Sequence, residues 1–290
     1  MTVEITRRHA LGWIVASGAQ CIFSHANADE ADRSERPNAP SSRYRLAFTH
    51  SKDNLIGDIL HGPRGEAHRQ SELPRHAWYT RETEHRFGSW GPKPRHYEPL
   101  EGIDDRPLAW QRERVLAVAE RFIGYGYQHH HIPDWDPPAH WPWKHSCVGH
   151  NGRGVDCSNF TSFVYNQGFG IHMSSEVVRQ SKLHAVAEGE HRTQLQRIDL
   201  PEAYDDRLKV LKTSDLLYIR GRVGGPITHV VLWVGSVGRS GSNTPLIIDS
   251  HGGGVENDEG RAIPCGIHLR PFREDSWYNR CASHAHRVFE

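Results

Sequence analysis

One cysteine and two histidines in this chain have surroundings that suit nucleophilic chemistry. Cys157 follows Asp156 at the start of an amphipathic run over residues 157–165. His229 and His251 each adjoin an apolar, strand-like run further along the chain. A thiol, a base and a polar group that orients the base are the parts of a thiol nucleophile. We therefore predict that Cys157 is a nucleophile, that His229 is its base, and that His251 orients His229.

Each of the three residues also has an ordinary structural interpretation. An isolated cysteine is often a small buried hydrophobe. The chain has 22 histidines, many of which must be ordinary surface or strand-end residues. The order of the three residues, and the kind of element expected beside each, favour the chemical interpretation.

The elements around Cys157 indicate how the thiol would be held. Asp156 is a good helix cap, and Phe160, Phe163 and Val164 recur at the spacing of one helical face. Cys157 would then lie in the first turn, where the helix dipole favours a thiolate over a thiol.

Further elements follow from periodicity and from apolar runs. Helices are predicted over residues 107–124 and 174–187, and strands over 216–219, 228–234 and 246–248. A helical first half followed by a meandering sheet is typical of an α+β domain. We therefore expect the α+β class.

Several ordered blocks carry a resemblance to a known family. They are a glycine-tyrosine turn at 122–127, an Asp-Cys-Ser block at 156–158, a strand entry at 211–219, and the block that begins at His229. From about residue 112 to about 273 the chain resembles the NlpC/P60 cell-wall cysteine peptidases. His251 matches the third polar position of that family.

The resemblance implies a fold, an activity and a set of contacts. The expected fold is papain-like, with N-terminal helices packed on a small antiparallel sheet. The expected activity is a thiol endopeptidase that cuts peptidoglycan stems between D-γ-glutamyl and a diamino acid. In some family members the residues that match Tyr127, Asp156 and Ser158 grip the free amine of the stem's L-alanine. Asp156 has an equally plain role as a helix cap.

Two other classes of function remain open at this stage. One is different acyl chemistry on the same scaffold, as in an N-acetylmuramoyl amidase or an acyltransferase. The other is a cell-wall-binding protein that has lost turnover. Peptidoglycan or a muropeptide is the expected partner in each case. The 35 basic and 35 acidic residues leave no basic footprint for nucleic acid. We expect no cofactor and no metal site, since the chain has no Cys-x-x-Cys pair.

The first 28 residues are typical of an export signal. Arg7 and Arg8 precede an apolar stretch over 13–23, and small residues follow at 26–28. Paired arginines favour the twin-arginine route, with an ordinary Sec signal as the alternative. We expect cleavage near Ala28 and a periplasmic or secreted product. No later stretch is apolar and long enough to predict stable membrane insertion.

The rest of the chain divides into an extension and a catalytic domain. Residues 29–105 are predicted to be a polar extension with no recognised module, and residues 106–290 the catalytic domain. An insert over 128–153, rich in His and Trp, is expected to form an exposed or lid-like loop rather than a metal site. Three of its tryptophans are candidates for a wall against a sugar or peptide: Trp135, Trp141 and Trp143.

The remaining cysteines permit one disulfide if Cys157 stays reduced. Cys265 and Cys281 are close in sequence, while Cys147 could pair with either of them or lie near Cys157. The sequence does not choose between these pairings. Nor does it give the exact bond cleaved, the biological role of the cleavage, the role of the insert or the oligomeric state.

Overall fold

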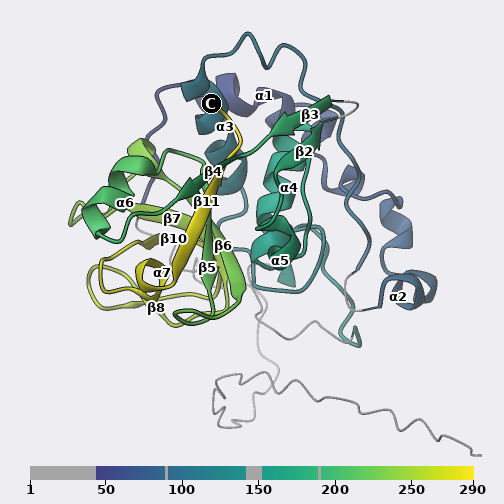
Figure 1. Ribbon diagram of the computed structural model, residues 1–290. Coiled ribbons are helices and arrows are strands. Elements are labelled where there is room, and N and C mark those ends of the chain that lie inside the picture. Colours follow the sequence, from purple (N-terminus) through teal and green to yellow (C-terminus); the bar gives the residue numbers. More distant parts are fainter. Residues whose placement is uncertain (1–43, 89–90, 142–151, 189–190) are drawn as a thin grey trace, which may run out of the picture. The chain divides into compact units, whose positions relative to one another are not determined.

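A six-stranded antiparallel sheet with two long helices against it forms the centre of the fold (Figure 1). The computed structural model describes residues 44–88, 91–141, 152–188 and 191–290. These residues all belong to one compact unit. The mixture of helices with an antiparallel sheet confirms the predicted α+β class.

The helices include two that face the sheet and several short ones. Their bounds are α1 Lys52–Leu60, α2 Arg81–Phe87, α3 Leu108–Glu120, α4 Cys157–Phe169, α5 Val177–Gln180, α6 Tyr204–Val210 and α7 Trp277–Arg280. Single turns of 3₁₀ helix occupy Pro63–Gly65, Ala67–Arg69, Arg75–Ala77 and Gly235–Val237.

Three sheets contain all the strands of the described residues. The large sheet has the order β10-β7-β6-β5-β11-β4, and the smaller ones have the orders β1-β2-β3 and β8-β9. The strand bounds are β1 Ile171–His172, β2 Ala185–Glu188, β3 His191–Gln194, β4 Gln196–Asp199, β5 Leu216–Arg220, β6 Ile227–Trp233, β7 Leu246–His251, β8 Val255–Glu256, β9 Ala262–Ile263, β10 Gly266–Pro271 and β11 Ala282–Arg287.

Both faces of the large sheet are buried in its middle strands. Successive side chains of a strand point to opposite faces. Leu216 and Val230 accordingly pack with the helices in one core cluster, whereas Leu217 and Val231 join a second cluster on the other face. Burial on both faces explains why these strands are continuous apolar runs in the sequence. The three strands expected there are confirmed, although β7 continues to His251.

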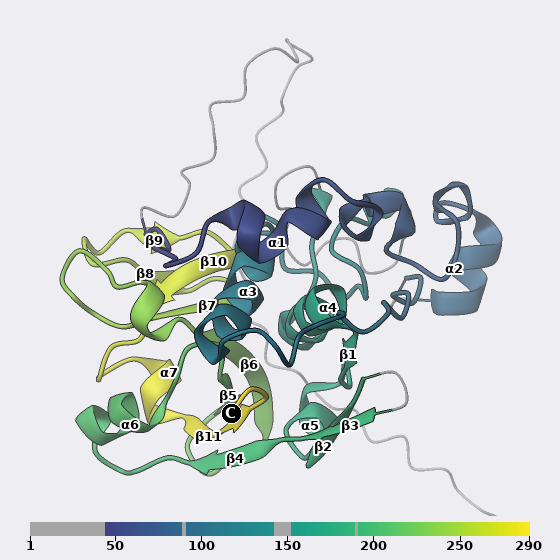
Figure 2. The same ribbon diagram turned by 90° about the horizontal axis from the view of Figure 1, so that it is seen from above.

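Helices α3 and α4 lie side by side against the first face of the sheet, as Figure 2 shows from above. Helix α4 begins at Cys157, and the Asp156 side chain accepts a hydrogen bond from the Asn159 backbone N–H. Gly170, in a left-handed conformation, ends it. The helices expected at both places are confirmed.

The helix expected over residues 174–187 is wrong in most of its length. Only Val177–Gln180 is helical, and Ala185–Glu188 forms strand β2 instead. Strand β2 pairs with both β1 and β3, so its backbone hydrogen bonds are satisfied across strands rather than along a helix.

The described part of the N-terminal extension packs on the same core as helices α3 and α4. Leu55 and Ile59 of α1 belong to the cluster that contains Val115 of α3. The buried guanidinium of Arg114 forms a salt bridge with Asp58 at 2.7 Å. Residues 44–88 and 91–105 therefore form a closely packed arm against this core.

No helix in the described ranges is both long and apolar enough to span a bilayer. The predicted signal at residues 1–28 lies outside the described residues.

Candidate active site

Cys157 is the first residue of helix α4, and it lines a cleft. Asp156 caps the helix through its Oδ1 atom, 2.9 Å from the Asn159 nitrogen. The cysteine is a free thiol and is only 4 % exposed. The capping residue fixes the direction of the first turn, and with it the position of the thiol.

His229 lies beside Cys157, near the start of strand β6, and is buried. One ring nitrogen, Nε2, is 2.6 Å from the Oδ2 atom of Asp249, and the ring also hydrogen-bonds the Cys157 side chain. Burial by itself lowers the pKa of His229. The charge of Cys157 and the hydrogen bonds that the ring makes with Asp249 and Cys157 outweigh burial, and they raise the pKa to about 10. The imidazole is therefore held between a thiol and a carboxylate.

Asp249 is a fully buried carboxylate on strand β7 with three different partners. Besides His229, its Oδ1 atom accepts a hydrogen bond from Arg270 Nε at 2.8 Å. Its Oδ2 atom also accepts one from the Tyr278 hydroxyl at 2.8 Å. Burial works to raise the pKa of Asp249, but Arg270 and His229 together hold it well below the ordinary value. Asp249 is thus an anion that fixes the far nitrogen of His229.

His251 occupies a different place from the one expected for it. Its ring lies 5.2 Å from that of His229, edge to face, and its Nδ1 atom accepts a hydrogen bond from the Gly253 backbone at 3.1 Å. The hydrogen bond that we expected from His251 to His229 is made by Asp249 instead. Burial lowers the pKa of His251 to about 4, so the ring is neutral near pH 7.

The sequence did contain a signal for Asp249. It stands two residues before His251 on the same strand, and residues at that spacing share one face of a sheet. The site therefore has two polar residues aimed at the same region, and only the packing of neighbouring strands selects between them. Arg270 and Tyr278, which hold Asp249, come from β10 and α7 and have no sequence pattern in common.

A cleft of about 390 Å³ adjoins Cys157. Its lining includes all three residues expected to contact substrate: Tyr127, Asp156 and Ser158. The Ser158 hydroxyl donates to the backbone oxygen of Ser175 at 2.6 Å. Burial raises the pKa of Tyr127, as do the nearby charges of Cys157 and Asp156, so its hydroxyl stays protonated. The fold thus brings these three side chains together with the thiol.

Tyr127 reaches the cleft because the glycine-tyrosine turn is joined to the segment before Cys157. The Gly126 nitrogen donates to the Arg153 oxygen at 2.7 Å, and the Val155 nitrogen donates to the Gly126 oxygen at 3.2 Å. A side chain at Gly154 would lie 2.2 Å from the Gly126 oxygen. Glycine at position 154 is therefore required for this close approach.

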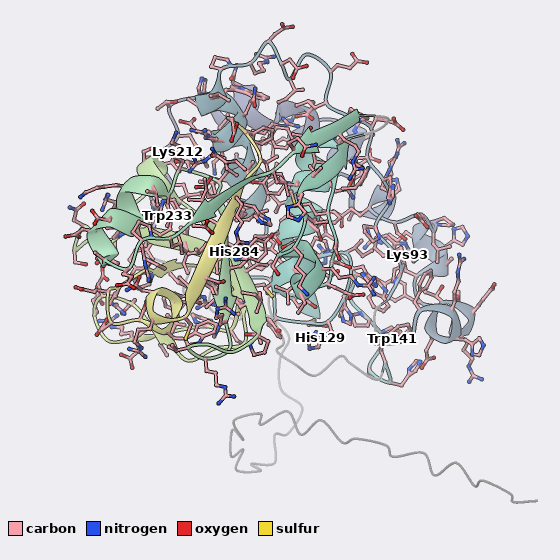
Figure 3. The ribbon with its side chains drawn as sticks, viewed as in Figure 1. Lys93, His129, Trp141, Lys212, Trp233 and His284 are labelled. Atoms are coloured by element: carbon pink, nitrogen blue, oxygen red, sulfur yellow. The ribbon has the colours of Figure 1, made fainter. Side chains whose placement is uncertain are left out.

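The insert contributes two histidines to the same cleft. His129 and His131 line it, and Figure 3 labels His129 near the lower end of α4. His129 Nδ1 is 3.2 Å from Asp156 Oδ2, and His131 Nδ1 is 3.0 Å from the Asn159 side-chain oxygen. His130 points the other way and is fully buried. The His130 backbone nitrogen donates to the Gln128 oxygen at 2.9 Å, and this tight turn gives two cleft residues and one core residue.

The expected tryptophan wall is wrong for the two described tryptophans of the insert. Trp135 and Trp141 are buried in the core and pack edge to face, with ring centroids 4.6 Å apart. Their apolar surface contributes to folding rather than to a ligand surface. Trp143 lies outside the described residues.

Asp134 holds the described part of the insert in place. Its Oδ1 atom accepts hydrogen bonds from Tyr125 at 2.6 Å and from Arg153 at 2.8 Å. Its Oδ2 atom accepts one from Gln70 of the N-terminal arm, also at 2.6 Å. The arm, the glycine-tyrosine turn and the insert therefore meet at one buried carboxylate.

A second hollow, of about 540 Å³, adjoins His251. Trp277 and Tyr278 of α7 line it, together with the charged side chains of Arg273 and Asp275. Among the described residues, no three His, Cys, Asp or Glu side chains converge as metal ligands do.

The states of the described cysteines rule out one of the possible disulfide pairings. Cys281 is a buried free thiol, whereas Cys265 is in a disulfide. A bond between Cys265 and Cys281 is therefore excluded. Cys147 lies outside the described residues.

Comparisons with known proteins gave matches among solved structures alone. This chain is similar to structures of NlpC/P60 proteins. One is an NlpC/P60 family protein from Bacillus cereus, with a TM-score of 0.34 and 18 % identity over 62 % of this chain and 40 % of that one. Another is the peptidoglycan hydrolase RipB of Mycobacterium tuberculosis, with a TM-score of 0.37 and 16 % identity over 67 % of this chain and 74 % of that one.

A third similar structure is the NlpC/P60 domain of the peptidoglycan hydrolase SagA, with a TM-score of 0.32 and 20 % identity over 60 % of this chain and 96 % of that one. No family model and no curated protein matches this chain. All three likenesses are distant, at 20 % identity or less.

Proposed function

We propose that this protein is an exported peptidoglycan hydrolase of the NlpC/P60 type, a thiol endopeptidase with Cys157 as nucleophile and His229 as base. The observation that carries the proposal is the chain of contacts from Cys157 through His229 to Asp249. We assign the third, orienting role to Asp249 rather than to His251. The motifs at 122–127, 156–158 and 211–219 support the family.

The contacts suit acyl transfer through a thioester. Asp249 accepts a hydrogen bond from Nε2–H of His229, which leaves Nδ1 to hold the proton that comes from Cys157. The sulfur then attacks the peptide carbonyl, and the imidazolium protonates the departing amine. Water hydrolyses the thioester with His229 again as base. The buried Arg270 keeps Asp249 ionised throughout this cycle.

The start of α4 supplies donors for the oxyanion. The backbone N–H groups of Cys157 and Ser158 lie in the first turn and have no acceptor within the helix. They point toward the N-terminus of α4, the end at which Cys157 lies. A single donor of this kind contributes about 3 kcal/mol to the transition state.

The bond proposed for cleavage is that between D-γ-glutamyl and the diamino acid of a peptidoglycan stem. It rests on the family resemblance of the residues that line the cleft. Peptidoglycan hydrolysis is also the activity named for SagA and RipB. Export to the periplasm or beyond rests on the paired arginines and the apolar stretch of residues 1–28.

Digestion of purified peptidoglycan by the full chain, with products identified by mass spectrometry, tests the proposal. Fragments cut after D-glutamate are expected from the wild-type protein and none from Cys157→Ala. Intact stems released from glycan would instead assign an amidase. Binding to peptidoglycan without any product would assign a wall-binding protein, and full activity of Cys157→Ala would refute the mechanism.

A further inference from the structure

The carboxylate of Asp156 has its two oxygens engaged by different partners. Oδ1 accepts hydrogen bonds from the backbone and the side chain of Asn159, at 2.9 and 3.0 Å. This atom caps helix α4. Oδ2 faces the insert, where it lies 3.2 Å from His129 Nδ1. The capping role and the cleft-facing role of Asp156 are therefore divided between its two oxygens.

His129 lies against Asp156, one of the three residues expected to grip a substrate amine. Its ring also lies edge to face with Tyr127, the second residue expected to grip an amine, with ring centroids 5.6 Å apart. The third, Ser158, already directs its hydroxyl at the Ser175 oxygen. An ammonium group needs acceptors. Two carboxylates line this cleft, and each already has a partner: Asp156 contacts His129, and Glu176 forms a salt bridge with Arg179 at 2.9 Å.

The placement of His129 is built into the fold rather than left to a free loop end. The next residue, His130, is fully buried, where it hydrogen-bonds Gln128 at 2.7 Å and contacts the Trp135 ring. The residue after His130, His131, hydrogen-bonds the Asn159 side chain of α4. His129 is nevertheless 36 % exposed in its side chain, so it faces whatever enters the cleft.

The hydrogen bond that Asp156 accepts from His129 also favours a charged imidazole. It raises the pKa of His129, although burial opposes the change. A protonated His129 neutralises Asp156 and repels a second cation at the same place. An amide nitrogen, which carries no charge, meets no such repulsion.

We propose that His129 determines specificity: it takes the place of a substrate amine at Asp156, so the cleft accepts stem peptides whose L-alanine nitrogen is acylated. This is the state of a stem that is still attached to its glycan strand. The inference rests on the proposed function and refines its substrate class. It gives the insert a role in substrate selection.

Two synthetic stem tetrapeptides that differ only at the N-terminus test the inference, one with a free L-alanine amine and one N-acetylated. For the wild-type full chain, kcat/KM for the acetylated peptide should equal or exceed that for the free amine. In His129→Ala, the ratio of free-amine to acetylated kcat/KM should rise about tenfold or more, the scale of one hydrogen bond to a charged group.

His131→Ala is the matched control, because His131 lines the same cleft but contacts Asn159. It should change kcat/KM for both peptides by the same factor. A wild-type preference for the free amine would overturn the inference, as would an unchanged ratio in His129→Ala. If the folded wild-type protein cleaves neither these peptides nor peptidoglycan, the proposed function itself fails, and the inference with it.

Discussion

The Nε2 atom of His229 lies 2.6 Å from the Oδ2 atom of Asp249, and both side chains are buried. The two residues are 20 positions apart in sequence and lie on the neighbouring strands β6 and β7. Arg270 and Tyr278 bind the same carboxylate. Asp249 is therefore an orienting group with its own support, and this relationship leads to three of the predictions below.

Asp249→Asn should lower kcat on peptidoglycan by about three to four orders of magnitude, because an amide favours the wrong tautomer of His229. His251→Gln should lower kcat by less than about tenfold, since His251 makes no hydrogen bond to His229. Steady-state assays of both variants provide the check. A larger loss in His251→Gln than in Asp249→Asn would return the orienting role to His251.

Tyr278→Phe should destabilise the protein by about 1–2 kcal/mol, because one hydrogen bond to a buried carboxylate is lost. The loss of kcat should be smaller than in Asp249→Asn, since Arg270 still holds the carboxylate. Chemical denaturation and the same assay measure both effects. Tyr278→Phe tests the hydrogen bonds around Asp249 even if Asp249→Asn does not fold. An unchanged free energy of unfolding in Tyr278→Phe would count against a stabilising role for these bonds.

The pH dependence of kcat/KM should report the raised pKa of His229. The imidazolium persists up to its pKa of about 10, so activity should hold through pH 9 and fall as pH rises through about 10. The stability that this group contributes is present below its unfolded pKa of about 6.5 and is lost as pH rises toward 10. Asp249→Asn should move the alkaline limb to lower pH; a limb in the same place would contradict the assignment.

Acid should destabilise the fold through buried neutral histidines. Burial lowers the pKa of His286 to about 4, and its ring packs against Tyr218. The unfolded chain takes up a proton below pH 6.5 that the folded chain refuses, so stability falls as pH drops from about 6.5 to 4. In His286→Phe this fall should be about 2 kcal/mol smaller between pH 7 and pH 4.5. Denaturation curves at both pH values would show it, and an equal fall would refute it.

Asp134→Asn should loosen the described part of the insert, because Arg153 loses its buried ionic partner. We expect a loss of about 2–3 kcal/mol in stability and a higher KM. Labelling of Cys157 by iodoacetamide should stay within about twofold, since α4 keeps its own cap. Asp199→Asn, which breaks the exposed pair with Arg197, is the control and should cost less than about 0.5 kcal/mol. Equal losses in the two variants would show that Asp134 does not anchor the insert.

Local chemistry made much of the fold predictable. A capping residue before an amphipathic run predicted that a helix begins at Cys157, and apolar runs predicted β5, β6 and β7. These signals depend on residues close in sequence, so they survive without tertiary information. The segment 174–187 was mispredicted because strand pairing with β1 and β3 outweighed its helical pattern.

The sequence by itself determined which residue types were present for thiol chemistry and on which elements they stand. Tertiary structure decided that Asp249 rather than His251 meets His229, because both share one face of β7 and only strand packing separates them. It also decided that His129 turns toward Asp156 while His130 turns into the core. Contacts between residues far apart in sequence depend on how whole elements pack, and no local pattern encodes that packing.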